Sequence, residues 1–157
     1  MDWRIVTYNP LSSQKMLRLR HISRTLHTAA AIGFPGSQFR GDPKVCIQQQ
    51  LQHHTVFRFA VAKNNKSIGI GLMLRKDLFP PNTTRSIHTP PPKWYGRFGA
   101  VRACRNDVDF TFITVYVPVA PKNHKDRSDV DKLWEFVSDF TSKLPNRTVP
   151  ILMTDAN

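Results

Sequence analysis

The stretch VPILMTDAN, residues 149–157, combines an apolar run with a polar end. Residues 149–153 form a short, nearly continuous apolar run, which predicts a strand buried within a sheet. Pro145-Asn146 stops the preceding helical pattern, so the strand begins after a turn. Thr154, Asp155 and Asn157 are therefore expected at the carboxyl end of this strand.

Other apolar runs along the chain also predict strands. Residues 109–117 are apolar on both faces, which indicates a central strand covered on both sides. Two pairs of runs are close enough in sequence to form antiparallel hairpins, one of them through Asn64-Asn65. The expected strands are 3–8, 32–34, 56–62, 68–74, 98–105, 109–117 and 149–153.

Two segments have the spacing of amphipathic helices. The first spans residues 15–31, with an apolar face opposite Arg20, Arg24 and His27, and such outward arginines are most often solvated. The second begins at a capping-box pattern over residues 128–131 and continues to Leu144. The apolar face of the first helix consists of Leu19, Ile22, Leu26, Ala29 and Ala30.

The remaining segments are predicted to be irregular. Residues 40–54 are expected to be a loop, in which the adjacent His53 and His54 are polar loop residues without partners at metal-ligand spacing. Residues 79–96 contain five prolines, so we expect a long exposed connection there.

This element order predicts an α/β fold, a layered domain of mixed sheets with helices outside. A wholly parallel, doubly wound sheet is disfavoured because the hairpins are antiparallel. No internal repeat or linker divides the sequence, so residues 1–157 are expected to form one domain.

The charge balance favours a polyanionic partner. Lys and Arg number 23 against 11 Asp and Glu, a formal net charge of +12. Such a field attracts nucleic acid, and we favour that interpretation over a basic surface that serves solubility alone. No apolar run of about 18 residues suits a membrane span. No secretory signal is present, and Cys46 and Cys104 are expected to be reduced, so the predicted location is intracellular, the nucleus included.

Three motifs in this order resemble the endonuclease/exonuclease/phosphatase superfamily, which has the DNase I-like fold. RIVTYN (4–9) is similar to its opening strand, FITVYVP (112–118) to its Tyr-x-Pro strand, and VPILMTDAN (149–157) to its Gly-Asp-x-Asn strand. IGIGLML (68–74) looks like its glycine-rich strand. Within the superfamily, the sequence looks most like the AP-endonuclease-type domains of non-LTR retrotransposons.

The resemblance implies a four-layer α/β sandwich, two mixed sheets flanked by helices, of which this chain would form a part. It also implies Mg²⁺-assisted hydrolysis of phosphate esters. In that chemistry, oxygen ligands hold the ion, a carboxylate orients the attacking water, and amide or phenol donors stabilise the charged transition state.

Four residues match site positions of the family. Asn9 matches the asparagine that orders the metal and phosphate region, and Tyr116 the tyrosine that donates to the phosphate. Asp155 matches the carboxylate that positions the water, and Asn157 the amide that contacts the phosphate. Without the resemblance, Tyr116 reads as a core aromatic residue and Asn9 as a turn residue.

The sequence departs from the family pattern at several positions. Gly36 stands where the family has its metal-binding Glu, so no metal ligand is assigned in this chain. Leu11, Val119 and Thr154 replace residues that many members carry as Asp, Asn and Gly. The family's closing Ser-Asp-His motif is absent from residues 1–157, so we expect a C-terminally incomplete domain.

Three hypotheses follow for function. The first is a truncated or degenerate endonuclease-like domain, whose ancestor cleaved DNA with Mg²⁺ and which itself has little or no activity. The second is a noncatalytic, basic module that binds nucleic acid, DNA above all. The third is a retroelement remnant without a selected function. Whether the chain is an enzyme stays open between them.

Overall fold

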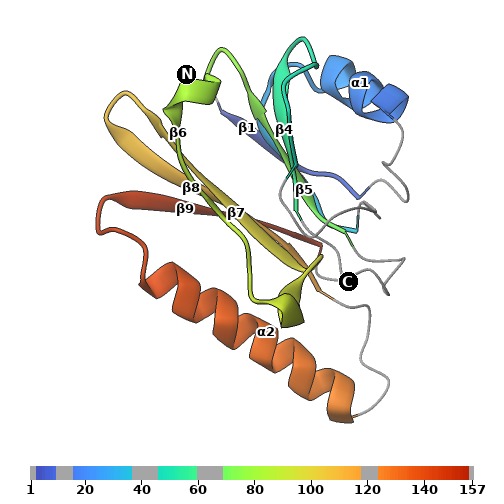
Figure 1. Cartoon of the computed structure of the whole chain (residues 1–157), viewed down its shortest axis with the longest axis vertical. Helices are drawn as coiled ribbons and strands as arrows, with labels where there is room; N and C mark the ends of the chain where they lie inside the picture. Colours follow the sequence, from blue (N-terminus) through green and yellow to red (C-terminus); the bar gives the residue numbers. More distant parts are fainter. Residues whose placement is uncertain (1–2, 10–15, 37–45, 60–68, 118–123, 156–157) are drawn as a thin grey trace.

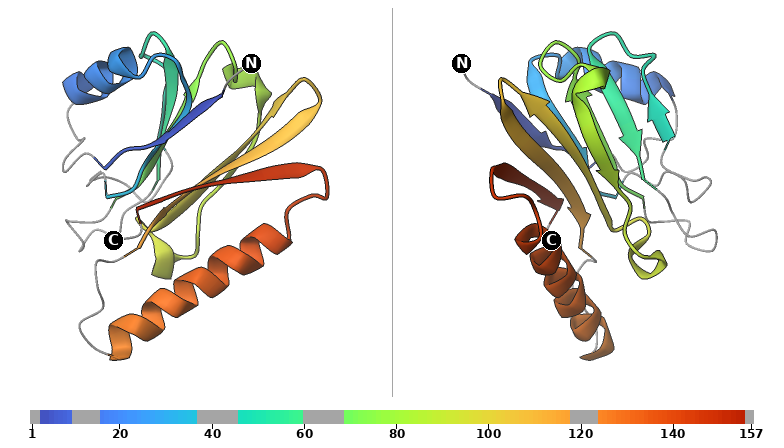
Figure 2. Two further views of the ribbon diagram at one scale, coloured as in Figure 1. Left: turned by 180° about the vertical axis from the view of Figure 1, so that it is seen from behind. Right: turned by 60° about the vertical axis from the view of Figure 1, so that its left-hand side comes forward.

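The computed structural model describes residues 3–9, 16–36, 46–59, 69–117 and 124–155. Two β-sheets pack face to face in it, and one helix covers the outer face of each sheet (Figures 1 and 2). The described residues therefore form the predicted partial four-layer α/β sandwich. Neither described helix is both long and apolar enough to cross a membrane.

The first sheet has the strand order β1-β2-β5-β4-β3. β1 and β2 are parallel, and the other neighbours are antiparallel, so the sheet is mixed. The pairing of β4 with β5 confirms the first predicted hairpin, although its turn lies outside the described residues. The strands are β1 (Arg4–Thr7), β2 (Ala29–Phe34), β3 (Cys46–Gln48), β4 (His54–Arg58) and β5 (Gly71–Arg75).

The second sheet has the order β6-β7-β8-β9. β7 and β8 form the second predicted hairpin, which turns at Asn106 and Asp107 with φ angles of 48° and 63°. Asn and Asp tolerate this left-handed conformation better than other side chains do. β9 runs parallel to β8 at the edge of the described sheet, and its Val149 and Leu152 side chains are exposed, so the prediction of a buried strand there was wrong. The strands are β6 (Thr84–His88), β7 (Phe98–Arg105), β8 (Val108–Tyr116) and β9 (Thr148–Asp155).

Three apolar clusters hold the layers together. One lies between the sheets and contains Phe57, Phe79 and Phe112. A second joins the first sheet to α1 (Met16–Thr25) through Leu19 and Ile22. The third joins the second sheet to α2 (His124–Ser142), whose apolar face includes Leu133 and Val137.

The predicted boundary between the first helix and the next strand was wrong. α1 ends at Thr25, and Ala29 and Ala30 belong to β2 instead of the helix. All six residues of β2 are buried, because the strand lies between β1 and β5 and is covered on both faces. Pairing and burial here override the helical propensity of alanine.

Three further predictions need correction. The segment 40–54 contains β3, because residues 46–48 pair with β4 along the edge of the sheet. The segment 79–96 contains β6 and two 3-10 turns, Pro81–Thr83 and Pro92–Trp94, and Trp94 is buried against the α2 cluster. α2 begins at His124, so residues 128–131 lie inside the helix and form no cap.

Close approach between the sheets depends on glycine. A Cβ atom on Gly99 of β7 would lie 2.3 Å from Cγ of Phe59, so the phenyl ring occupies the space of the missing side chain. A Cβ atom on Gly33 of β2 would lie 2.7 Å from Cβ of Met153 in β9. Any side chain at either position would push the sheets apart.

We expect Gly99→Ala to lower the free energy of unfolding by about 1–3 kcal/mol, because overpacking forces neighbours off their preferred conformations. Urea unfolding measures this loss. Phe59→Leu removes the ring that the new methyl group meets, so the double variant should be more stable than the sum of the two single effects predicts. Strictly additive effects would contradict this account of the contact.

His54 is a buried core residue, which corrects the prediction of a polar loop pair. Its Nε2 lies 3.2 Å from the Ala29 carbonyl oxygen, and its Nδ1 lies 2.8 Å from Oγ of Ser23. Since a carbonyl can only accept, Nε2 carries the proton and Nδ1 accepts from the serine hydroxyl. Burial lowers the pKa of His54 from 6.5 to about 4.

This shift makes stability depend on pH. Above pH 6.5 the ring is neutral in both the folded and unfolded states, whereas between pH 6.5 and about 4 only the unfolded state takes up the proton. Stability is thus expected to fall over that interval, by up to about 3 kcal/mol. An NMR titration should find the His54 ring neutral down to about pH 4, and a normal titration near 6.5 would refute the prediction.

Candidate active site

The carboxyl ends of four strands meet at one edge of the sandwich. Each sheet contains one parallel pair, β1 with β2 and β8 with β9, so both strands of each pair end on the same side. Tyr116 at the end of β8 lies directly beside Asp155 at the end of β9. In the other sheet, the amide of Tyr8 donates to the carbonyl of Gly33, which leads the chain onward to Asn9.

A hydrogen bond between side chains joins the two sheets at this edge. Nδ2 of Asn9 donates to Oδ2 of Asp155 over 2.5 Å, although the residues are 146 positions apart in sequence. Asn9 is exposed and Asp155 is half-buried, so the pair lies at the solvent boundary. Two residues that the motifs singled out are therefore in direct contact.

Gly36 lies beside the same residues. A Cβ atom there would be 3.0 Å from Oδ1 of Asn9 and 3.3 Å from Cε2 of Tyr116. The φ angle of Gly36 is +72°, a conformation that residues with side chains rarely adopt. The position that the motif comparison matched to a metal-binding Glu is thus at the site, with a backbone conformation that suits glycine.

Arg97 is a site residue that the sequence analysis missed. Its carbonyl accepts the amide of Tyr116 over 2.9 Å, and its guanidinium carbon lies 5.9 Å from the centroid of the tyrosine ring. Its Nη1 is buried and has no hydrogen-bond partner within the described part of the chain. Arg97 could have been predicted from the expected hairpin, because it immediately precedes strand 98–105, which was expected to pair with 109–117.

The charge on Arg97 persists in this setting. Burial lowers the pKa of the guanidinium below its ordinary value, while Tyr116 and Asp129 act in the opposite direction. Because the ordinary pKa of arginine is above 12, the group remains protonated at neutral pH. A cation with an unused donor therefore stands beside Tyr116, in a place suited to an anion.

The described residues do not fit Mg²⁺ at this edge. The ion prefers several hard oxygen ligands, carboxylates above all, and here Asp155 already accepts from Asn9 while Gly36 offers no side chain. Across the described ranges, no group of three His, Cys, Asp or Glu side chains is arranged to hold a metal. Thr154 precedes Asp155 within β9, and the motif positions Leu11, Val119 and Asn157 lie outside the described residues.

The fold and the site together define a class of protein. Its members are two-sheet α/β sandwiches with a polar site where parallel strands from both sheets end. The sequence itself matches no protein-family model and no curated protein sequence. Solved structures resolve the class further, and the chain has the endonuclease/exonuclease/phosphatase-type, DNase I-like fold.

Three solved structures illustrate this likeness. The chain is 12% identical to D. rerio TDP2 complexed with a single-strand DNA product, with a TM-score of 0.62 over 98% of this chain and 60% of that one. It is 15% identical to the endonuclease domain of TRAS1, a telomere-specific non-LTR retrotransposon, with a TM-score of 0.52 over 99% and 59%. An AP endonuclease from Archaeoglobus fulgidus is 11% identical, with a TM-score of 0.57 over 96% and 55%.

The chain thus spans about 60% of the length of the TDP2 and TRAS1 structures that it matches. At these identities the likeness defines the fold.

Proposed function

We propose that residues 1–157 form a degenerate endonuclease-like domain, which retains the nucleic-acid-binding end of the sandwich but has little or no Mg²⁺-dependent hydrolytic activity. The observation that carries this proposal is Gly36. It lies against Asn9 and Tyr116, where the resemblance places the metal-binding Glu, and its φ of +72° disfavours any side chain.

The side chains present suit phosphate binding better than phosphate cleavage. The guanidinium of Arg97 can donate to phosphate oxygens, and Tyr116 can donate its phenol proton. Asp155 is the carboxylate that would orient an attacking water, but its Oδ2 already accepts from Asn9. Solved neighbours include a Neisseria 3′ phosphatase bound to a product DNA hairpin, which supports DNA as the first partner to test.

Plasmid nicking tests the loss of cleavage. With purified chain, supercoiled DNA and Mg²⁺, we expect nicking no faster than that of the Asp155→Ala variant. The physical reason is that one engaged carboxylate cannot both hold the ion and orient the water. Clear Mg²⁺-dependent nicking by the parent chain that Asp155→Ala abolishes would overturn the proposal.

Gly36→Glu tests whether the missing carboxylate alone explains the loss. The new side chain meets Asn9 and Tyr116 in a backbone conformation that is strained for Glu. We expect this variant to lose about 1 kcal/mol or more of unfolding free energy and to gain no nicking activity. Restored cleavage at unchanged stability would show that the site is intact apart from this one residue.

A second candidate function is nucleic-acid binding without any ancestral chemistry, and Arg97 favours it. Arg97 is half-buried beside the Tyr116 ring and carries a positive charge, so a phosphate at this edge would meet a cation. Arg97→Gln should therefore weaken binding of single-stranded DNA roughly tenfold, as expected for the loss of one charge-assisted hydrogen bond.

Fluorescence anisotropy measures the Kd for single-stranded DNA. Arg147→Gln is a matched control, because Arg147 is exposed ahead of β9 and loses the same charge. Asp155→Asn should tighten binding, since it removes a negative charge beside the phosphate and keeps an oxygen that can accept from Asn9. Equal losses in Arg97→Gln and Arg147→Gln would assign binding to net charge alone.

A further inference from the structure

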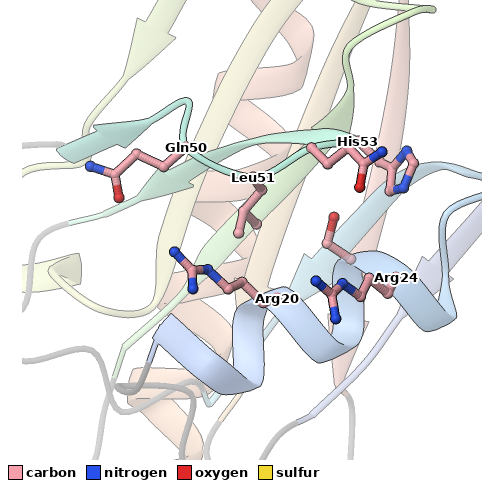
Figure 3. Close-up of a pocket in the computed structure, with 7 residues that line it drawn as sticks. Arg20, Arg24, Gln50, Leu51 and His53 are labelled. Atoms are coloured by element: carbon pink, nitrogen blue, oxygen red, sulfur yellow. The ribbon is translucent and has the colours of Figure 1, made fainter.

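A pocket lies between α1 and the segment that leads into β4, away from the candidate site. Arg20, Ser23 and Arg24 line it from the helix, and residues 50–53 line it from the other side. Its volume is about 150 Å³, enough for one small anion. In Figure 3 the Arg20 side chain extends from α1 toward the side of Gln50, and the Arg24 side chain lies along α1 toward Arg20.

The lining has the chemistry of an anion site. Arg20 and Arg24 are exposed and stand one helical turn apart, and buried Ser23 lies between them in the lining of the pocket. No carboxylate lines the pocket. Among the described residues, neither arginine forms an ion pair, although like charges at this spacing destabilise a helix. A bound anion would remove that repulsion.

The rim opposite the helix is held in place by the fold. Nζ of Lys76 donates to the carbonyls of Gln49 and Leu51 over 2.6 and 2.7 Å. Leu51 is buried in the cluster beneath α1, so the segment is anchored from both sides. The hydroxyl of Ser23 is occupied by His54. The donors left for an anion are the two guanidinium groups, with the side chains of Gln50, Gln52 and His53 around them.

A second hollow of about 350 Å³ continues this surface. It shares Gln52 and His53 with the pocket and extends to His27, Arg75 and Lys76. Its one carboxylate, Asp77, is paired with Nε of Arg75 over 2.7 Å. The two hollows together form a polar track with room for more than one phosphate group, which favours a phosphate polymer over a single ion.

This track is at the far end of the first sheet from the candidate site. β5 is antiparallel to β2, so Gly71 pairs with Phe34 near Gly36, whereas Leu74 pairs with Ala31 toward the other end. Arg75 and the pocket thus lie at the end of β2 where the strand begins. α1 covers the outer face of the sheet, while Asn9 and Asp155 join the two sheets at the opposite edge.

We propose that Arg20 and Arg24, with Gln50, Gln52 and His53, bind a backbone phosphate of a nucleic-acid strand, as a second contact separate from the Asn9–Asp155 edge. The proposal shares with the proposed function only the nature of the partner. The net charge of +12 attracts the strand, and two guanidinium groups one helical turn apart can donate together to one phosphate.

The test compares two variants that each lose two positive charges. Arg20→Gln/Arg24→Gln removes the pocket, and Lys132→Gln/Arg147→Gln removes two exposed charges around α2. Anisotropy with a labelled 20-nucleotide single strand measures Kd at several salt concentrations. We expect at least a tenfold loss at low salt for the pocket variant and less than a threefold loss for the control. The salt dependence should also become less steep for the pocket variant only.

Several results would overturn the proposal. Equal losses in both variants would assign binding to net charge, and no loss in the pocket variant, or no binding by the parent chain, would remove the contact. Binding of inorganic phosphate, or of vesicles of phosphatidylserine and phosphatidylcholine, is measured with the same variants, and the Arg20→Gln/Arg24→Gln variant could lose that binding instead. If the oligonucleotide affinity of the pocket variant were unchanged at the same time, that result would assign the pocket to another ligand. A loss with Arg97→Gln but none with the pocket variant would overturn this inference and leave the proposed function standing.

Discussion

The contact between Gly33 and Met153 sets the distance between the two sheets near the candidate site. Because a Cβ atom on Gly33 would come within 2.7 Å of the Met153 side chain, β2 and β9 can approach this closely only without one. Gly99 and the ring of Phe59 repeat the arrangement elsewhere in the interface. Asn9 follows β1 in one sheet and Asp155 ends β9 in the other, so their 2.5 Å hydrogen bond depends on this spacing.

The same spacing accounts for the geometry around Gly36. The chain leaves β2 at Phe34 and reaches Gly36 directly over Asn9 and Tyr116, where the left-handed conformation turns it past them. A side chain at this point would have to displace the side chains of Asn9 and Tyr116 slightly and adopt a left-handed backbone conformation. A side chain in place of Gly36 would therefore disturb the contacts of two other residues, Asn9 and Tyr116.

Much of the fold follows from the sequence, because hairpins and buried strands are encoded locally. The β7–β8 hairpin was predictable from its two apolar runs, and the position of β9 from its apolar run and the stop before it. The burial expected for β9 was wrong, because the strand lies at the edge of the described sheet with Val149 and Leu152 exposed. The first residues of β2 were not predictable from the sequence. Ala29 and Ala30 favour a helix by propensity, and they form a strand because they are buried between β1 and β5. His54 was likewise unpredictable, since its partners Ser23 and Ala29 come from distant elements.

The candidate site was likewise predictable only in part. The order of the motifs in the sequence predicted Asn9, Tyr116 and Asp155 as site residues. The parallel pairing of β1 with β2 and of β8 with β9 explains why the ends of strands from both sheets meet. Arg97 belongs to no motif, and its importance lies in a buried Nη1 without a described partner, which only packing can produce.

The hydrogen bond between Asn9 and Asp155 also gives both motif residues a structural role. An amide and a carboxylate that join two sheets contribute to stability whether or not they act on a substrate. Loss of either would leave the other without its partner at the edge where four strands end. The polar pair that carries the resemblance to nucleases therefore has a structural reason to remain, independent of cleavage.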